Sequence, residues 1–373
     1  MTNRSAITNK ECYGCMLCVS KCPVGAIGFY SDSCGFISPT IDSSACVECG
    51  ICERQCIANY PPDIEKEITK AYSATLFDKK SLAKSASGGA AYGLGLAQLT
   101  SRGIVYGVAY TDDYRNAEYI RIDNEKDLSK LQDTKYFHAK EGSKKKLFGD
   151  VSKDLKIGNS VLVIGLPCEI AALRKVFDKN KGLILCELFC HGVTSAMTHE
   201  KYLDESVGTE KVCHFSVKAK IKGWQKNSYI YIKTLKGKSV QEQFYSSPYG
   251  YAFSHLSRQS CYSCRFKGEH RVGDLSIGDF WGIVNTADDY NKDGVSVIQV
   301  HTEQGKEILE KSGKYLQINE IDTDKALLDN VWVEKSIPIN DRETYAKKFA
   351  AHKQIYVPVK VKLKKLIKSA IRR

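Results

Sequence analysis

The cysteines near the start of this chain repeat one spacing twice. The first copy is Cys12-x2-Cys15-x2-Cys18-x3-Cys22, and the second is Cys46-x2-Cys49-x2-Cys52-x3-Cys56. In such repeats three closely spaced cysteines wrap one cubane [4Fe–4S] cluster, and the fourth cysteine ligates the other cluster. We therefore expect cluster one on Cys12, Cys15, Cys18 and Cys56, and cluster two on Cys46, Cys49, Cys52 and Cys22. Two adjacent clusters of this kind store and pass single electrons.

A pair of zinc sites is the alternative, because C-x2-C repeats also bind zinc. A triplet at x2-x2 spacing with a fourth cysteine after three residues is a poor tetrahedral layout, which favours the clusters. Ile57 follows Cys56 where Pro23 follows Cys22, and this difference affects only the local exit turn. Cys34, between the copies, is expected to be a small buried side chain.

A second set of cysteines follows expected secondary structure. An apolar strand at 161–164 leads to Cys168 and a helix over 169–177, and a strand at 183–189 ends at Cys190. A strand–helix–strand unit makes parallel strands with a right-handed crossover. Cys168 and Cys190 should then share the carboxyl edge of the sheet, where open α/β sheets place ligands.

Cys261 and Cys264 precede another expected strand at 275–277. We therefore hypothesise a third [4Fe–4S] cluster on Cys168, Cys190, Cys261 and Cys264. Two alternatives stay open: a structural zinc on Cys261 and Cys264 with two other ligands, and a catalytic thiolate at Cys168, since a helix N-terminus lowers a thiol pKa. Cys186 and Cys213 lie in strand-like sequence and are expected in the core.

Two glycine-containing segments could border a bound cofactor. The loop 85–90 opens a helix-like run to Leu99, before a strand at 104–110, and free N–H groups at such a start attract phosphate. Close packing through glycine and alanine explains the same loop. Gly278 and Asp279, after the strand at 275–277, border the expected pocket or serve a tight turn.

Length and charge limit the classes of protein. The chain has 373 residues, enough for two or three domains, and a net charge of +12. Seven Lys and Arg lie in 360–373, so the rest carries about 12 − 7 = +5. Met1–Lys10 have no apolar signal region, and no apolar run approaches a membrane span. We expect a cytoplasmic protein with reduced cysteines.

The basic tail has apolar residues at helical spacing after Pro358. This pattern suits a peripheral anchor on the inner face of an anionic membrane, or a docking surface for an acidic partner. A helix packed on its own domain is the alternative. Nucleic acid is not expected, because the tail has no interleaved aromatic residues.

The expected fold class combines α+β and α/β parts: a small ferredoxin-like 2×[4Fe–4S] module, then a larger mixed α/β domain, which a family resemblance implies is flavin-binding. We divide the chain into 1–62 for the module, 63–150 and 151–340 for the N-terminal and C-terminal parts of the second domain, and 341–373 for the tail. The lysine-rich segment 135–156 is expected to be solvated surface or linker. A strand at 295–300 and a helix at 303–311 complete the expected elements.

These motifs together resemble the beta-subunit family of coenzyme F-420 hydrogenase and dehydrogenase. The resemblance spans roughly Cys12 to Trp281, and rests on Ser87-Gly88-Gly89, the segments 165–175 and 188–193, Cys261-x2-Cys264 and 278–282. It implies FAD and an iron–sulfur cluster in the second domain. It also implies that Ser87, Gly88, Gly89, Lys135 and Tyr136 belong to the flavin cradle.

The resemblance implies an oxidoreductase. Electrons from ferredoxin or another redox protein would pass through the clusters to FAD, which exchanges a hydride with a small organic substrate. That substrate is the deazaflavin coenzyme or another molecule, and the tail would suit a surface-polysaccharide pathway. His191 is the expected proton donor near the flavin. Its alternative role is a hydrogen bond to the cluster or to the backbone. The alternatives are an electron-transfer subunit without a substrate site and a non-enzymatic iron–sulfur binding protein.

Overall fold

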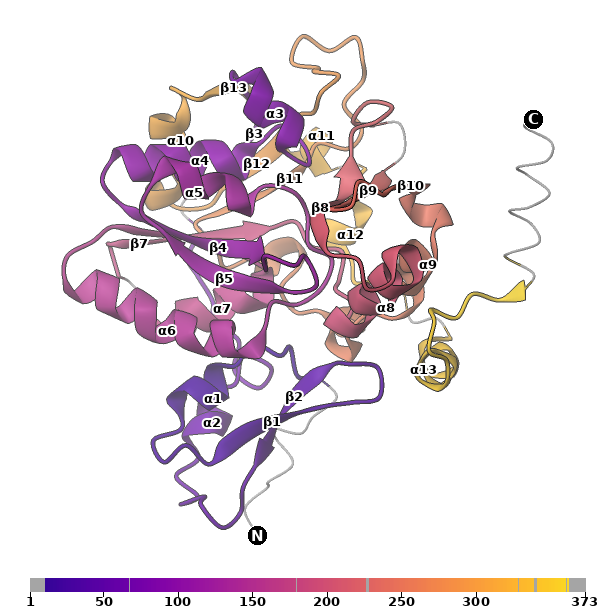
Figure 1. The fold of residues 1–373 in the computed structure, drawn as a ribbon. Coiled ribbons are helices and arrows are strands. Elements are labelled where there is room, and N and C mark those ends of the chain that lie inside the picture. Colours follow the sequence, from indigo (N-terminus) through magenta and orange to yellow (C-terminus); the bar gives the residue numbers. More distant parts are fainter. Residues whose placement is uncertain are drawn as a thin grey trace.

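The computed structural model describes residues 11–66, 68–178, 180–225, 228–327, 329–338, 341–359 and 361. A small N-terminal module lies below a large mixed sheet, and a smaller sheet stands beside that sheet (Figure 1). In these ranges no helix is both long enough and apolar enough to cross a bilayer.

The N-terminal module consists of two short helices and a hairpin. Its elements are α1 (Leu17–Lys21), β1 (Ile27–Ser31), β2 (Ile37–Ile41) and α2 (Ile51–Arg54). β1 and β2 pair antiparallel, with Ile27 opposite Ile41. This is the small ferredoxin-like layout that the cysteine repeat predicts.

Both cysteine loops of the module adopt the same unusual backbone. Gly14 and Met16 have φ angles of 66° and 64°, and Glu48 and Gly50, at the equivalent positions of the second copy, have 52° and 69°. A left-handed conformation costs a non-glycine residue roughly 1–2 kcal/mol. Concave nests of successive backbone N–H groups are a recurring frame for iron–sulfur clusters. The two copies therefore share a loop geometry that suits the same kind of ligand.

The large sheet is parallel at its centre and antiparallel on its flanks. Its strands in spatial order are β13 (Leu316–Ile321), β3 (Lys70–Leu76), β12 (Ser296–Val300), β11 (Leu275–Asp279), β7 (Leu183–Leu188), β6 (Val161–Gly165), β4 (Ile104–Tyr110) and β5 (Ala117–Ile122). The run β4, β6, β7, β11 is parallel. The expected strand–helix–strand unit is confirmed, and strands from 63–150 and from 151–340 join in one sheet.

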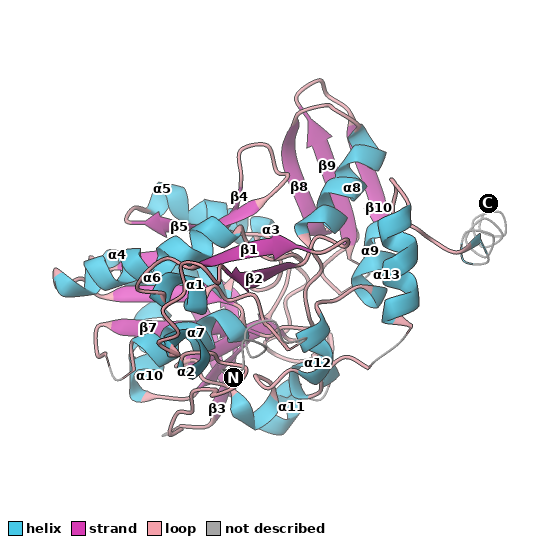
Figure 2. Cartoon of the chain, turned by 90° about the horizontal axis from the view of Figure 1, so that it is seen from below, coloured by secondary structure: helices cyan, strands magenta, loops and turns pink. Residues whose placement is uncertain are grey.

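The central strands are buried on both faces. Along β6, Val161 and Val163 pack into one core while Leu162 and Ile164 pack into another. The covering helices are α6 (Glu141–Lys156) and α7 (Pro167–Val176) on one face, and α4 (Ala90–Thr100) and α10 (Glu303–Ser312) on the other. Figure 2 shows the N-terminal module lying across α6 and α7. The module is thus packed on the same core as those two helices.

The lysine-rich segment 135–156 is not the solvated surface or linker expected from its composition. Most of it forms α6, whose Leu147, Phe148 and Val151 are buried at helical spacing. The prediction was wrong because the many lysines of the exposed face dominate the composition, so the short row of apolar residues is not apparent in the sequence. One lysine, Lys144, is itself buried.

The smaller sheet has its own core. Its strands, in spatial order, are β10 (Ser239–Gln243), β9 (Tyr229–Thr234) and β8 (Val212–Ala219). The helices around this core are α8 (Ala196–Val207), α9 (Pro248–His255) and α13 (Arg342–Ala351). Tyr345 and Phe349 of α13 are buried there, so the stretch after residue 341 begins as a packed helix rather than as a tail. The basic stretch 362–373, with Lys360, lies outside the described residues.

Short helices complete the fold: α3 (Lys79–Lys84), α5 (Glu125–Leu128), α11 (Thr323–Leu327) and α12 (Val331–Glu334). Three cysteines, Cys34, Cys186 and Cys213, are not among the twelve that the sequence assigns to clusters. Cys34 and Cys186 are buried as expected, whereas Cys213 on β8 is only half-buried and corrects the expectation of a core position.

Candidate redox site

The first cysteine loop gathers the four residues that the spacing assigns to cluster one. Burial raises the pKa of the Cys15 thiol to about 12, and Cys12 and Cys56 add to the shift. Burial likewise raises the pKa of Cys18, with Cys15, Cys12 and Cys56 adding. Cys56 therefore lies with the first loop, although it belongs to the second copy. We call Cys12, Cys15, Cys18 and Cys56 the inner cysteine group.

The second loop gathers the other set. Burial raises the pKa of Cys52, and Cys49 and Cys46 add to the shift. Cys22 and Cys52 pack on one small apolar cluster of the module, around Val19. We call Cys46, Cys49, Cys52 and Cys22 the outer cysteine group, because Cys49 is exposed to solvent.

A third cysteine group forms at the carboxyl edge of the large sheet. Cys168 lies at the start of α7, Cys190 follows β7, and Cys261 and Cys264 lie in and after a 3-10 turn at Gln259–Ser263. Burial raises the pKa of Cys168 well above its usual value, and Cys190, Cys264 and Cys261 add to the shift. The four residues of the hypothesised third cluster are thus brought together.

The alternatives for these cysteines fit the geometry less well. No three Cys, His, Asp or Glu side chains in the described ranges converge tightly enough to hold one metal ion. A tetrahedral zinc site needs four ligands at about 2.0–2.3 Å from the metal, whereas the ligands of a cubane surround a larger body. A reactive thiolate at Cys168 would need a lowered pKa, but burial acts in the opposite direction.

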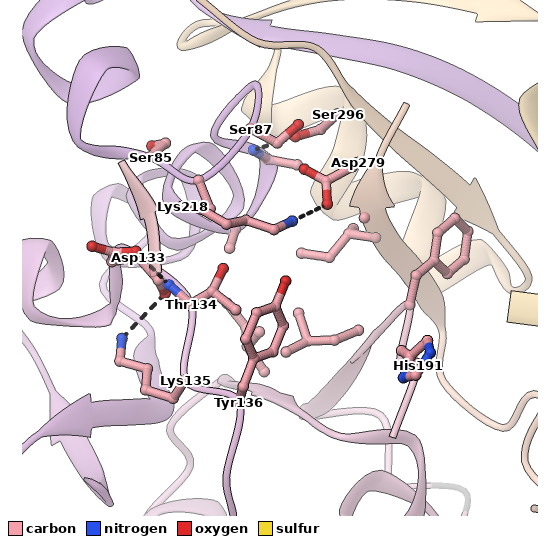
Figure 3. A pocket seen from close by; sticks show the side chains of 18 of the residues that line it. Ser85, Ser87, Asp133, Thr134, Lys135, Tyr136, His191, Lys218, Asp279 and Ser296 are labelled. Atoms are coloured by element: carbon pink, nitrogen blue, oxygen red, sulfur yellow. Dashed lines mark hydrogen bonds and ion pairs between the residues drawn. The ribbon is translucent and has the colours of Figure 1, made fainter. Parts of the chain in front are cut away.

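A cavity of about 630 Å³ opens beside the third cysteine group, where β6, β7 and β11 end. Seven of the expected site residues line it: the catalytic candidate His191, and Ser87, Gly89, Lys135, Tyr136, Gly278 and Asp279 expected at the cofactor. Figure 3 labels Ser87, Lys135, Tyr136, His191 and Asp279. Gly88 does not line the cavity. A Cβ on Gly88 would lie 2.2 Å from the Ala74 carbonyl oxygen, so this glycine serves close packing.

Two of the lining residues use their side chains to bind backbone carbonyls of the cavity wall, so these polar groups are not free to bind a ligand. The Ser87 hydroxyl donates to the Val295 carbonyl at 2.6 Å. The Lys135 ammonium donates to the carbonyls of Gln132 and Leu131 at 2.8 and 3.1 Å. Burial lowers the pKa of Lys135 to about 8. Lys135 therefore fixes the turn that carries Tyr136.

An ion pair whose two side chains are only 12% and 13% exposed forms the polar wall of the cavity. Lys218 of β8 pairs with Asp279, and the Tyr136 hydroxyl points into the cavity next to them (Figure 3). Burial opposes the charge of Lys218, but the Asp279 carboxylate outweighs it and raises the pKa of the ammonium. Burial raises the pKa of Tyr136 to about 12, and the Lys218 charge partly offsets this shift. Tyr136 therefore keeps its proton and can donate a hydrogen bond.

His191 stands on the opposite wall, next to Cys190. Its ring stacks on Phe253 with centroids 5.0 Å apart. Burial and the Lys267 charge lower the pKa of His191 to about 4, so the imidazole is neutral near pH 7. His191 is therefore next to a cysteine of the third group and also lines the cavity.

Comparison with known proteins assigns both parts of the chain. Residues 11–60 match the 4Fe-4S dicluster domain, and residues 158–324 match the C-terminal domain of the coenzyme F420 hydrogenase/dehydrogenase beta-subunit family. Two segments of the chain, separated by residues 61–157, are thus similar to a 4Fe-4S dicluster domain and to the C-terminal domain of this beta-subunit family. The resemblance drawn from the motifs is thereby confirmed. No curated protein matches the chain.

The fold is also similar to that of a solved protein. The similar chain comes from the xenon-derivatised F420-reducing [NiFe] hydrogenase complex of Methanosarcina barkeri. The TM-score is 0.51 and the sequence identity 18%, over 80% of this chain and 98% of that chain. At this identity the similarity concerns the fold.

The beta-subunit family match begins at residue 158, so the wall formed by 85–139 lies outside it. That wall has the features of a phosphate cradle. Gly89, with φ 84°, precedes α4 and offers it no side-chain cap, and Ala90, Ala91 and Tyr92 of the first turn line the cavity. The Ala90 N–H donates to the Ser296 hydroxyl at 3.4 Å, which leaves the phosphate-binding role to the N–H groups that follow it. Free N–H groups at a helix start hold phosphate well.

Two further residues of the cavity carry chemistry that the sequence alone did not indicate. Glu169 of α7 is 4% exposed and accepts hydrogen bonds from Tyr119 and from the Leu166 N–H through Oε2. Its Oε1 is buried and has no hydrogen-bond partner among the described residues, so it is available to a donor group of a ligand. Lys218 comes from the smaller sheet, and its strand shows no motif. The volume, the open helix start and these polar groups fit a flavin nucleotide.

Proposed function

We propose that the chain is an iron–sulfur flavoprotein oxidoreductase. Its three cysteine groups would hold three [4Fe–4S] clusters, and the cavity would hold FAD and a small organic substrate. The electron partner would be ferredoxin or another redox protein. The matched family and the similar hydrogenase are both named for F420, which makes a deazaflavin coenzyme the first substrate to test.

One observation carries this proposal: the cysteine groups and the cavity follow one another in space. Cys15 and Cys56 of the inner group pack against the same core as Cys168 and Cys264 of the third group. The outer group shares the module with the inner one. His191 and Glu169, each adjacent in sequence to a cysteine of the third group, line the cavity. Electrons could therefore pass between the solvent-facing module and the cavity through adjacent sites.

The side chains of the cavity have separable roles in this proposal. A bound flavin would supply hydride exchange with the substrate and single-electron exchange with the clusters. The start of α4 would bind phosphate, and Glu169 Oε1 would accept from a ring N–H. Tyr136, kept protonated beside Lys218, would donate a hydrogen bond to the substrate. His191, expected as a proton donor, is neutral near pH 7 and stands on the facing wall, so we assign it a hydrogen bond to the bound substrate.

An electron-transfer subunit without its own substrate site is the second candidate. The chain of similar fold belongs to a hydrogenase complex, which favours a chain that works with partner proteins. In that case the cavity would hold flavin alone. Reduction of the isolated chain's flavin by a small hydride donor would argue against this candidate.

Cofactor content of the anaerobically purified protein tests the proposal. Iron, sulfide, zinc and released flavin are measured per chain. About twelve irons with one FAD would support three clusters and a flavin, by the cubane count. About eight irons with FAD would remove the third cluster. Iron without flavin would leave an electron carrier or a non-enzymatic iron–sulfur binding protein.

A cytoplasmic location and a peripheral membrane contact of the basic tail complete the proposal. Deletion after Pro358, followed by vesicle flotation, tests the contact. Unchanged flotation without the tail would exclude the anchor.

A further inference from the structure

Two buried cations lie against the inner cysteine group. Lys144 of α6 is 2% exposed, and its ammonium donates to the Gly14 carbonyl at 2.7 Å. Arg258 is 5% exposed, and its Nη1 donates to the Cys12 carbonyl at 3.1 Å. Both cations belong to the body of the protein, but they contact the loop of the dicluster module.

These contacts couple the cations to the inner cysteine sulfurs. The Gly14 N–H donates to the Cys12 sulfur at 3.4 Å, so Lys144 and this sulfur share one short loop. The Arg258 guanidinium also lies against Gly14, between Cys12 and Cys15, where an added Cβ on Gly14 would meet Nη2 of Arg258 at 2.8 Å. A positive charge that stabilises a thiolate also stabilises the additional negative charge of a reduced cluster, because both effects are Coulombic.

The outer cysteine group differs from the inner one in exposure. Cys49 is exposed, and the neighbouring Val47 side chain is 61% exposed. Its loop also has a cation, because Arg54 donates to the Cys49 carbonyl at 3.0 Å, but this arginine is exposed, as are Glu48 and Glu53 beside it and Lys21 before Cys22. The charges around the outer group are therefore of both signs and screened by water, while the inner group is enclosed and lies against two buried cations.

Burial and charge act against each other at the inner group. Enclosure disfavours the more negative reduced state and lowers a reduction potential, whereas nearby cations raise it. A buried cation is screened far less than an exposed one. Without Lys144 and Arg258, the enclosed cluster would be the harder of the two to reduce.

We propose that Lys144 and Arg258 raise the reduction potential of the inner cluster to or above that of the outer cluster, so that electrons enter at the outer cluster and pass inward. This inference rests on the cluster ligands of the proposed function. With clusters bound at both cysteine groups, one electron would move from the outer group to the inner group, and a one-electron carrier protein would resupply it at the outer group. No bond or proton changes in this step. Lys144 and Arg258 would act through their charges, by changing the reduction potential of the inner cluster without binding it.

A redox titration monitored by electron paramagnetic resonance tests the inference on the full, anaerobically purified chain. A water-soluble paramagnetic relaxation agent broadens the signal of the exposed cluster and so identifies it. In the wild type we expect the enclosed cluster to be reduced no later than the exposed one. An enclosed cluster that is reduced clearly after the exposed one would overturn the inference, whether or not any variant folds.

Charge variants then assign the cause. Lys144→Gln and Arg258→Gln should lower the midpoint of the enclosed cluster and leave the exposed one in place. Lys144→Arg should retain the wild-type midpoint. The matched control is Lys145→Gln, because Lys145 is the exposed neighbour on the same helix. Unchanged midpoints in both neutral variants, with full iron content, would contradict the inference.

Iron content distinguishes a failure of the cluster-ligand assignment from a failure of the role given to Lys144 and Arg258. A wild-type chain with fewer than about eight irons and a single cluster signal would contradict the ligand assignment on which the inference rests. Two intact cluster signals with the reverse order of midpoints would contradict only the role of the cations.

Discussion

Tyr13 lies edge-on to Phe266, with ring centroids 5.1 Å apart and ring planes inclined by 61°. Tyr13 belongs to the inner cysteine loop, and Phe266 follows Cys264 of the third group by two residues. The Tyr13 hydroxyl accepts a hydrogen bond from the Arg265 N–H at 3.1 Å. Burial raises the pKa of Tyr13, and Cys264 and Cys168 add to the shift. The module and the body are thus joined by a packed aromatic contact between two cysteine groups.

Phe266→Ala should destabilise the protein by about 3–5 kcal/mol, because it removes a fully buried ring. Tyr13→Phe removes only the hydroxyl contact and should cost about 1 kcal/mol. Denaturant unfolding, followed by far-ultraviolet circular dichroism and by cluster absorbance, measures both. Equal stabilities of Phe266→Ala and the wild type would show that the two parts are not joined in this way.

The buried pair of Lys218 and Asp279 predicts strongly non-additive mutations. Lys218→Met or Asp279→Leu alone leaves a largely buried charge unpaired and should cost about 3 kcal/mol. The double variant Lys218→Met/Asp279→Leu should cost less than the sum of the single changes. A double-mutant cycle from unfolding of the flavin-free protein measures the coupling. Additive costs would mean that the pair does not interact in solution.

Cysteine variants should separate the groups from the isolated cysteines. Cys168→Ser should lower the iron content from about twelve to about eight per chain, because one cubane is lost. Cys34→Ser is the matched control. Its sulfur contacts only the Ala346 carbonyl, at 3.5 Å, among the hydrogen bonds that the structure records for it, and its iron content should stay unchanged. Loss of iron in both variants would point to general instability.

The sequence predicted those parts of the site that have local signatures. The cysteine repeat indicates which thiols belong together, because in such repeats the fourth cysteine of each copy binds the cluster of the other copy. The unit from Val161 to Leu188 is predictable because its strands are apolar throughout and its helix begins at Pro167. Each of these signals depends on residues close in sequence.

Other parts of the site depend on contacts between distant segments. Lys218 reaches the cavity from the smaller sheet, and nothing around it in the sequence marks it as a partner of Asp279. Gly88 lies in a loop that suggested phosphate binding, but its close contact with Ala74 shows that it serves packing. The buried Lys144 looks like any other lysine of α6. Tertiary packing, rather than local pattern, determines these roles.

Alanine substitutions at two glycines, Gly88 and Gly149, compare a tightly packed position with an open one. Gly88→Ala should destabilise the protein by about 3 kcal/mol, because the new Cβ would meet the backbone of Ala74 and Ser296, which cannot move aside. Gly149→Ala, in the middle of α6, meets nothing within 4 Å and should stabilise by about 0.5–1 kcal/mol. Thermal unfolding under identical cofactor loading compares them. A Gly88→Ala protein with wild-type stability would contradict the close approach.

His199 predicts an acid-sensitive core. It is fully buried among aromatic rings, and its Nε2 contacts the Tyr114 carbonyl at 2.7 Å. Burial lowers its pKa from 6.5 to about 4. Between about pH 6.5 and 4 the unfolded chain therefore binds a proton that the folded chain does not, so the free energy of unfolding falls as pH falls.

The size of this effect follows from the shift of His199. A depression from 6.5 to about 4 corresponds to roughly 3 kcal/mol of stability at neutral pH that is lost by about pH 4. His199→Gln keeps a donor toward Tyr114 but has no titrating group, so its unfolding free energy should depend less on pH across this window. Denaturant unfolding of both proteins at several pH values measures the difference, and the other acid-sensitive groups cancel in it. Parallel pH profiles would show that His199 is not the group responsible.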